Sequence, residues 1–222
     1  GQAALSWSAP STTGGSALTS FAYSYKRVTD TSWSSPVTTY LNTLVTVPGR
    51  TNGTAYQFVI YAVNAIGSSE SSTAVTATPY AAPRAPLGVN AQGGSTAVVL
   101  SWNIPANADL GGLTGSPDYL VSYSLTGITW TPWTVAPTIS GNTLTTTITG
   151  LNNGTSYLFR VAIKNSVAVP TLTSDYVTVA ATPASASAAP ATISVAAATT
   201  PGQVLVSWTA PANNGGYSIT GY

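Results

Sequence analysis

Short runs of alternating apolar and polar residues follow one another along the whole chain. The clearest runs, at 119–123, 145–148 and 157–163, are rich in β-branched and aromatic side chains. Gly-Gly, Asn-Gly and proline-containing clusters separate the runs, as tight turns between strands require. No stretch keeps the 3.6-residue period of a helix. The pattern therefore predicts an all-β chain of many short strands, folded as a sandwich or a barrel.

A repeat organises these runs. A Ser-Trp pair occurs three times in one frame, and its tryptophans, Trp7, Trp102 and Trp208, are spaced by 95 and 106 residues. An Asn-Gly-Thr-x-Tyr-x-Phe frame occurs at 52–58 and again at 153–159. A closing Val-x-Ala-Thr-Pro frame follows each of them. The spacing matches the length of one small sandwich domain, which is about 100 residues.

These frames, together with the Ala-Val-Asn-Ala-Ile-Gly segment at 62–67, resemble tandem fibronectin type III repeats of bacterial extracellular or surface type. The resemblance covers nearly the whole chain and implies immunoglobulin-like antiparallel β-sandwiches. It implies a first repeat at 1–80 that lacks strand A, a complete second repeat at 81–183, and the start of a third repeat at 184–222. The stretches at 80–86 and 184–190 are rich in Ala and Pro, and we expect them to be short, semi-rigid linkers.

The resemblance also implies where each strand lies. The expected strands of the first repeat are B at 3–8, C at 20–26, C′ near Trp33, E at 43–47, F at 55–63 and G at 72–78. Those of the second are A at 88–92, B at 97–103, C at 119–124, C′ at 130–135, E at 143–148, F at 156–163 and G at 175–181. Those of the third are A at 192–197, B at 203–209 and the opening of C at 217–222.

The repeated frames have structural interpretations. Trp7, Trp102 and Trp208 share one inward strand position, where a large aromatic ring anchors the core between two sheets. The Asn-Gly-Thr triplets at 52–54 and 153–155 match the pattern of an N-glycosylation acceptor. We favour the simpler interpretation, in which Asn-Gly forms a tight turn.

Tyr56 and Tyr157 resemble the tyrosine corner of such sandwiches, in which the hydroxyl group bonds to nearby backbone. The first repeat departs from the family pattern at Arg50, because the second repeat has Leu151 at that place. We expect the aliphatic part of Arg50 to lie over the edge of the core. We also expect this corner of the first repeat to be less well packed.

Three tryptophans are the candidate contact residues: Trp33, Trp130 and Trp133. They lie near strand C′, which is often an edge strand. An exposed tryptophan could stack on a sugar ring or contact another protein. The alternative, which we favour, is partial burial against the edge of the sheet.

The chain carries very little charge. Charged residues make up 5% of it and the net charge is +1, whereas soluble domains have roughly 25% charged residues. Such a weak field does not favour nucleic acid or anionic lipid as partners. No apolar run approaches the length of a membrane-spanning helix, so we expect no membrane insertion in this segment.

The residues used in most catalytic and metal sites are missing. The chain has no Cys and no His, which removes thiol chemistry, the familiar catalytic triads and zinc sites. The acidic residues are scattered over different loops. Of these, Asp109 and Asp118 flank a Gly-rich loop and could share a calcium ion, but their pattern fits no known calcium loop. We expect no catalytic, metal or cofactor-binding residues and no enzyme activity.

Three functional interpretations remain open. We favour a structural or adhesive segment of a larger bacterial cell-surface or extracellular fibre protein, because chains of low net charge repel one another little. Its expected partners are the neighbouring repeats and other copies in a fibre. The alternatives are a spacer in a secreted polysaccharide-degrading enzyme and a bacteriophage tail or decoration protein.

The ends raise one more expectation. Trp7 aligns with Trp208, and the first repeat lacks only strand A, whereas the third repeat brings both A and B. A head-to-tail fibre in which one molecule completes the next would therefore duplicate strand B. We expect instead a window from a longer array, with further repeats on both sides. We also expect Val204, Val206 and Trp208 not to be buried in the partial repeat.

Overall fold

The computed structural model describes residues 1–113, 115–167 and 171–222, and its regular elements are almost all β-strands. The exception among these residues is the 3-10 helix η1, Asn107–Asp109. All the strand pairs described are antiparallel. The predicted all-β fold is confirmed. No helix in the described part of the chain is long and apolar enough to cross a membrane.

Contacts between residues divide the chain into two compact units. Unit 1 comprises Gly1–Arg84, Ala106–Asp118 and Lys164–Thr173. Unit 2 comprises Ala85–Pro105, Tyr119–Ile163 and Ser174–Tyr222. Every contact discussed below lies within one unit.

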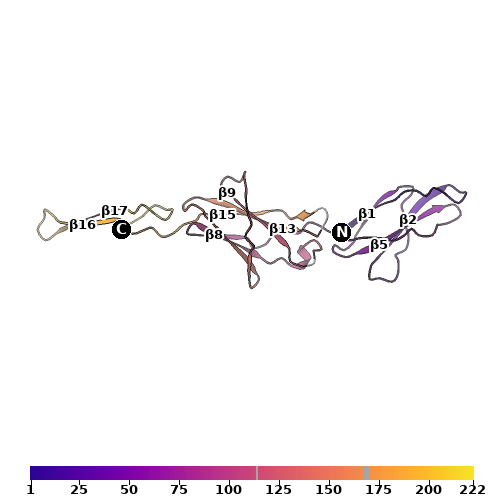
Figure 1. The fold of residues 1–222 in the computed structure, drawn as a ribbon, viewed down its shortest axis with the longest axis horizontal. Coiled ribbons are helices and arrows are strands. Elements are labelled where there is room, and N and C mark those ends of the chain that lie inside the picture. Colours follow the sequence, from indigo (N-terminus) through magenta and orange to yellow (C-terminus); the bar gives the residue numbers. More distant parts are fainter. Residues whose placement is uncertain (114, 168–170) are drawn as a thin grey trace. The chain divides into compact units, whose positions relative to one another are not determined.

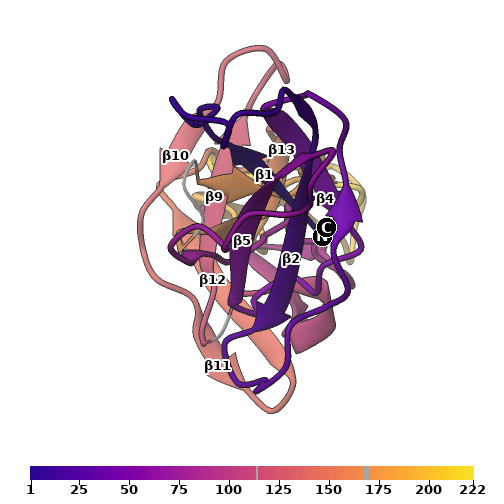
Figure 2. The same cartoon turned by 90° about the vertical axis from the view of Figure 1, so that its right-hand side faces the viewer.

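The first repeat contains a two-stranded and a four-stranded sheet. The two-stranded sheet pairs β1 (Gln2–Ser6) with β4 (Leu44–Pro48). The four-stranded sheet has the order β3 (Val37–Thr38), β2 (Leu18–Arg27), β5 (Tyr56–Asn64) and β6 (Val75–Ala77). The long strands β2 and β5 run side by side (Figure 2). One apolar core forms between the two sheets of this repeat. Its buried residues are Ala3, Leu5, Tyr23, Val47, Tyr56 and Phe58.

The second repeat contains a four-stranded and a five-stranded sheet (Figure 1). The four-stranded sheet has the order β11 (Thr138–Ser140), β12 (Thr143–Thr149), β8 (Ala97–Asn103) and β7 (Asn90–Gly94). The five-stranded sheet consists of β10 (Thr131–Trp133), β9 (Asp118–Ser124), β13 (Tyr157–Asn165), β14 (Leu172–Thr173) and β15 (Val177–Ala181). Within unit 2, Val98, Leu100 and Trp102 of β8 meet Phe159 and Val161 of β13 in one core.

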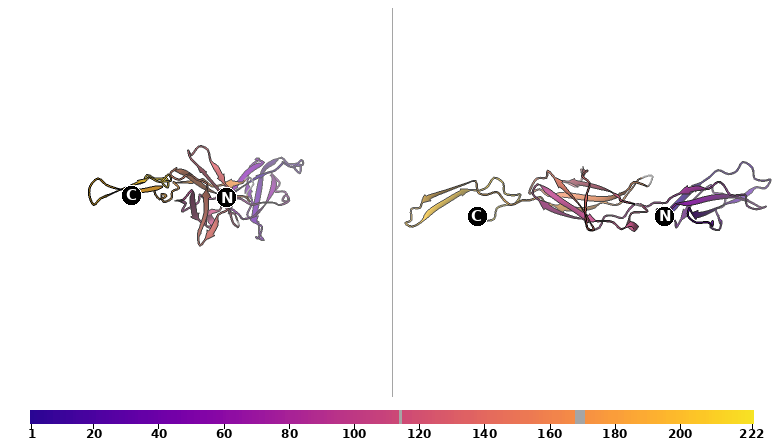
Figure 3. Two further views of the ribbon diagram at one scale, coloured as in Figure 1. Left: turned by 60° about the vertical axis from the view of Figure 1, so that its left-hand side comes forward. Right: turned by 60° about the horizontal axis from the view of Figure 1, so that its bottom comes forward.

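The predicted third repeat, at 184–222, contributes the hairpin of β16 (Thr192–Ala197) and β17 (Val204–Thr209). It is drawn as a two-stranded ribbon in yellow and orange in Figure 3. The expected opening of strand C at 217–222 forms no strand. In the first repeat, the C′ strand begins at Val37, later than the position expected from Trp33. Strands β11 and β14 were not predicted, because both are short edge segments without a clear alternation.

The three tryptophans of the repeated frame differ in burial. Trp102 is fully buried, Trp7 is half-buried, and Trp208 is 46% exposed. Trp102 lies on β8, which has a paired strand on each side. Its ring centroid lies 5.3 Å from that of Tyr119. Trp208 lies on a hairpin that forms a sheet of its own, which also leaves Val204 and Val206 exposed, as expected. The shared position is therefore fully buried only in the second repeat, where β8 has a paired strand on each side and the second sheet covers it.

The tyrosine corner is present in both repeats. The Thr51 N–H donates a hydrogen bond to the Tyr56 hydroxyl oxygen at 3.2 Å, and the Asn152 N–H donates to that of Tyr157, also at 3.2 Å. Both rings are buried. The preceding Asn-Gly pairs form turns with left-handed glycines, since φ is 76° at Gly53 and 78° at Gly154. The prediction of turns is confirmed.

Candidate functional site

Trp133 lies on β10, the edge strand of the five-stranded sheet, which is the C′ position predicted for it. Its Nε1 donates a hydrogen bond to Oγ1 of Thr146 at 3.0 Å, and its ring packs against the core of the second repeat. Thr146 belongs to β12 in the opposite sheet. Trp133 therefore links the two sheets.

Trp130 forms part of an aromatic stack in unit 2. The Cζ atom of Arg160 lies 4.1 Å from the ring centroid of Trp130 and 4.1 Å from that of Tyr176. The Arg160 Nε donates a hydrogen bond to the Ser122 hydroxyl at 2.8 Å. The Trp130 Nε1 donates to the Gly127 carbonyl at 3.0 Å. A cation held between two aromatic faces is attracted by both rings.

The strand pattern explains why Arg160 is available for this stack. Its neighbours Phe159 and Val161 are fully buried in the core. Because successive side chains of a strand point to opposite faces, Arg160 lies on the outer face of the sheet. Sequence reasoning did not identify Arg160 or Tyr176 as partners of Trp130. The outward position of a basic residue on a core strand was the signal that could have indicated it.

Trp33 lies between β2 and β3 in unit 1 and is 37% exposed. The Lys26 Nζ lies 5.2 Å from its ring centroid and donates a hydrogen bond to the Asp30 carbonyl at 3.1 Å. The Asp30 carboxylate accepts a hydrogen bond from the Arg27 N–H at 3.2 Å. The turn after β2 therefore holds the lysine near one face of the ring.

Arg50 stacks on the two tyrosines beside it. Its Cζ lies 3.7 Å from the ring centroid of Tyr25 and 5.5 Å from that of Tyr56, and its Nε donates to the Pro48 carbonyl at 3.2 Å. Tyr56 and Tyr157 are buried alike, at 4% and 6% exposed, but Leu151 belongs to the core of its repeat and Arg50 is only half-buried. Looser packing at this corner stays a prediction. The guanidinium group replaces the apolar contact of a leucine with cation–aromatic contacts.

These residues line one open cleft of about 420 Å³ in unit 1, bounded by Trp33 and Arg50. Hydrogen bonding with Thr51 lowers the pKa of Tyr56, although burial acts in the opposite direction. The side chain and the charge of Arg27 lower this pKa further. The cleft thus combines aromatic rings with three of the chain's six basic residues, Lys26, Arg27 and Arg50.

The group of cations and rings around Trp33 in the first repeat and the group around Trp130 in the second occupy similar places in the repeat. Their other residues differ. In the second repeat, Ser122 bonds to Arg160. In the first repeat, Ser24 pairs across the strands with Val59, which has no polar atom in its side chain. The Ser24 hydroxyl accordingly has no hydrogen-bond partner among the residues described. In both clusters a cation lies near one face of the tryptophan ring, so that face cannot stack on a sugar unless the cation moves. Glycan or protein contact through Trp33, Trp130 and Trp133 stays a prediction.

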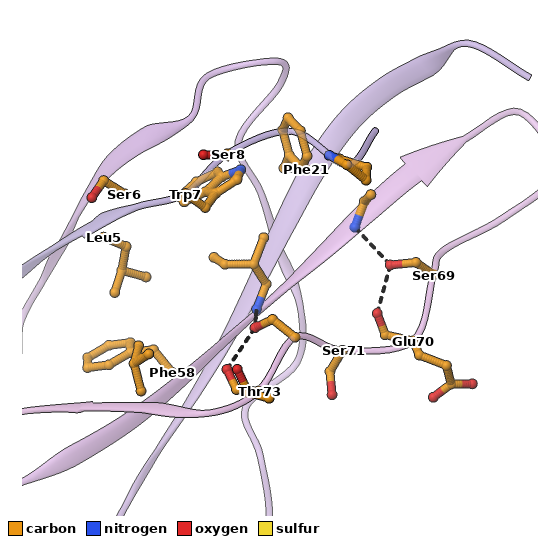
Figure 4. Close-up of a pocket in the computed structure, with 15 residues that line it drawn as sticks. Leu5, Ser6, Trp7, Ser8, Phe21, Phe58, Ser69, Glu70, Ser71 and Thr73 are labelled. Atoms are coloured by element: carbon orange, nitrogen blue, oxygen red, sulfur yellow. Dashed lines mark hydrogen bonds between the residues drawn. The ribbon is translucent and has the colours of Figure 1, made fainter. Parts of the chain in front are cut away.

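A second cleft, of about 400 Å³, lies beside Trp7 in unit 1 (Figure 4). Trp7 packs edge-on against Phe21 with ring centroids 5.6 Å apart, and Figure 4 shows both rings across the cleft from the segment at 69–73. The Trp7 Nε1 is buried without a hydrogen-bond partner among the described residues. Ser69 bonds through its hydroxyl group to the backbone of β5 at Ala62.

The second repeat shows what covers this cleft when strand A is present. There β7 pairs with β8, and Val89 and Ala91 pack against the core. In the described part of the first repeat, β1 pairs with β4 alone. One edge of β1 is therefore unpaired in the described part of the first repeat.

Two acidic residues line the clefts: Asp30 the cleft beside Trp33, and Glu70 the cleft beside Trp7. Asp109 lies 3.5 Å from Arg84 in an exposed ion pair, and the Ser166 hydroxyl donates to the Asp118 carboxylate at 2.5 Å. Within the described residues, no three potential metal-ligating side chains gather. The calcium alternative gains no supporting geometry.

Two repeated sandwiches with tyrosine corners define a class of small, all-β modules joined in tandem. The model of the fibronectin type III domain family matches residues 1–78 and 81–178. The chain belongs to the fibronectin type III family. It is similar to the crystal structure of the chicken CNTN1 FN1-FN3 domains, with 19% identity and a TM-score of 0.39. That match covers 93% of this chain and 70% of the other. Domains of this family are generally non-catalytic structural modules, and the tandem pair fits a non-catalytic repeat segment.

Proposed function

We propose that the chain is a structural or adhesive repeat segment of a larger bacterial cell-surface or extracellular fibre protein. The observation that carries the proposal is one backbone junction that the chain builds twice. Each copy joins an Asn-Gly turn and a following linker to the Gly-Gly loop of the next sequence repeat. A chain that reuses one junction is suited to building a regular array.

The first copy of the junction lies within unit 1. The Gly53 N–H donates to the Pro79 carbonyl at 2.8 Å, and the Ala81 N–H donates to the Gly111 carbonyl at 2.9 Å. The Arg84 N–H donates to the Asp109 carbonyl at 2.8 Å. The packing is so close that a Cβ atom on Gly111 would overlap the Ala81 carbonyl. Gly53 and Gly112 likewise meet backbone to backbone.

The second copy lies within unit 2 and repeats each bond. The Gly154 N–H donates to Pro183, the Ser185 N–H to Gly215, and the Ala188 N–H to Asn213, each at 2.9 Å. A Cβ atom on Gly215 would overlap the Ser185 carbonyl. The Asn153 Nδ2 adds a bond to the Ser185 hydroxyl at 3.2 Å. The junction is therefore made mainly by backbone atoms, which explains how it survives the change from Arg84 to Ala188.

The sparse charge and the absence of His and Cys support a structural role over an enzymatic one. Two alternatives place the chain elsewhere. As a spacer in a secreted polysaccharide-degrading enzyme it would be found in the medium, and as a bacteriophage tail or decoration protein it would be found on virus particles. The test is therefore where the native protein is found.

Antibodies raised against the purified chain would be applied to intact and to permeabilised cells of the source bacterium, with a cytoplasmic protein as control. We expect labelling of intact cells or of fibres attached to them in immunogold micrographs. Labelling of virus particles, co-purification with a polysaccharide hydrolase from the medium, or labelling of permeabilised cells alone would each contradict the proposal.

A further inference from the structure

The glycines of the loop at Gly14 and Gly15 have φ values similar to those of the two Gly-Gly loops in the junctions, at 111–112 and 215–216. The glycine pairs at 14–15, 111–112 and 215–216 have φ values of 67° and 83°, 65° and 94°, and 74° and 99°. These values lie in the left-handed region, which glycine adopts at little cost. The first repeat therefore has, at the equivalent place, a left-handed glycine pair like those that receive an Asn-Gly turn elsewhere in the chain.

An asparagine at the equivalent position of each of the first two repeats bonds to this loop. The Asn64 Nδ2 donates a hydrogen bond to the Thr13 carbonyl at 2.9 Å. The Asn165 Nδ2, at the end of β13, donates to the Leu110 carbonyl at 3.2 Å. The Asn64 Oδ1 also accepts bonds from the Ile66 and Gly67 N–H groups. The loop at Gly14 is thus fixed in place before any partner arrives.

Unlike its two counterparts, the loop at Gly14 is open. A Cβ atom on Gly14 would meet its nearest neighbour, Asn64 Nδ2, at 4.0 Å, and one on Gly15 would meet nothing within 4 Å. Among the residues described, no donor bonds to the carbonyls of Thr12 or Gly14, which correspond to the two acceptors filled in the other junctions. A cleft of about 450 Å³ adjoins the loop, and Ile66 at its rim is 86% exposed.

We propose that the Gly14–Gly15 loop is a docking surface for another fibronectin type III repeat. That repeat places an Asn-Gly turn against the glycine pair, and its Pro- and Ala-containing linker donates two N–H groups to the carbonyls of Thr12 and Gly14. This inference rests on the proposed role as a repeat array. A second copy of this chain does not fit, because both of its Asn-Gly-Thr turns, at 52–54 and 153–155, are already docked.

The first test compares three matched substitutions in the 222-residue chain: Gly14→Asn, Gly111→Asn and Gly215→Asn. Asn tolerates the left-handed conformation, so each change adds bulk with little backbone strain. Amide hydrogen exchange by NMR reports on the linker donors. We expect Gly111→Asn to speed exchange at Ala81 and Arg84 by at least about tenfold, which is about 1.4 kcal/mol. Gly215→Asn should do the same at Ser185 and Ala188, and Gly14→Asn should change neither pair.

The second test fills the open loop. An extended chain carries a copy of residues 81–201 ahead of Gly1, because Gly202-Gln203 aligns with Gly1-Gln2. In this chain the added copies of Ser185 and Ala188 should become protected from exchange by about tenfold or more. Introducing Gly14→Asn into the extended chain should abolish that protection.

The proposal is overturned if the added linker amides exchange at the unprotected rate, or if Gly14→Asn leaves their protection unchanged. It is also overturned if the 222-residue chain dimerises at high concentration and Gly14→Asn breaks the dimer, because the occupant would then be a second copy. These measurements use purified chains and do not depend on cellular location. A failed surface-labelling experiment would therefore leave the docking result standing, and the reverse also holds.

Discussion

The repeated tryptophan position allows one sharp prediction about stability, since Trp7, Trp102 and Trp208 are equivalent in sequence but not in burial. Trp102 is fully buried in the core of the second repeat. A buried tryptophan removes about 150–250 Å² from water, which at about 25 cal/mol per Å² corresponds to about 4–6 kcal/mol. Truncation to Ala leaves a cavity that relaxes in part, so we expect Trp102→Ala to cost about 3–5 kcal/mol.

The other two positions serve as internal controls. Trp7 is half-buried beside an open cleft, so Trp7→Ala should cost about half as much as Trp102→Ala by the same proportionality to area. Trp208 is 46% exposed on a hairpin without a covering sheet. We expect Trp208→Ala to change the stability of the first two repeats by less than about 0.5 kcal/mol.

Urea denaturation followed by hydrogen exchange on peptides of β1 and β8 would measure each repeat separately. Ala106–Asp118 and Lys164–Thr173 belong to the second repeat in sequence but to unit 1 by their contacts. A substitution in one repeat can therefore affect the other, so the stability of each repeat needs its own measurement. A cost below about 1 kcal/mol for Trp102→Ala would refute the core assignment. Equal costs for Trp7→Ala and Trp102→Ala would refute the link between burial and energy.

Three further predictions concern single side chains. Tyr157→Phe removes the hydroxyl that accepts a backbone hydrogen bond and should lower the free energy of unfolding by about 1–2 kcal/mol in urea denaturation. Burial raises the pKa of Tyr119, so its contribution to stability is full below the ordinary tyrosine pKa of about 10 and is lost as pH rises further. The free energy of unfolding of Tyr119→Phe, relative to that of the parent chain, should therefore increase from pH 9 to pH 11. A difference that stays constant over this range would contradict this. Arg160→Ala loses contacts with two aromatic rings and should cost about 1 kcal/mol, more than Lys26→Ala, whose ammonium group lies over one exposed ring.

The sequence predicted the parts of the fold that follow from alternation and repetition. The frame around Trp102 correctly placed β8, whose residues alternate between the core and the outer face. The Asn-Gly-Thr-x-Tyr frame correctly placed the turn before β13 and the tyrosine corner. Both signals are local, so that a single sequence suffices to reveal them.

The sequence did not reveal features that depend on contacts between distant residues. Trp130 and Tyr176 share a contact with Arg160 of β13, although the three residues are far apart in the sequence. Arg50 is accommodated because Tyr25, on another strand, offers a ring face. The pairing of Gly53 with Gly112 joins segments that no local pattern connects. Such contacts follow from the assembled sheets and loops, and the sequence pattern shows only that each residue faces outward or lies in a turn.

The hairpin of β16 and β17 has a consequence for the order in which the chain folds. Its two faces already differ, because Ser194 and Ser207 bond to each other on one side while Ile193 pairs with Trp208 on the other. Hairpins form within about 1–10 μs because their contacts are local. In the second repeat the corresponding strands, β7 and β8, are also the first to be synthesised. The second repeat can thus begin from a two-sided template, the hairpin of β7 and β8, whose apolar face is covered by strands that are synthesised later.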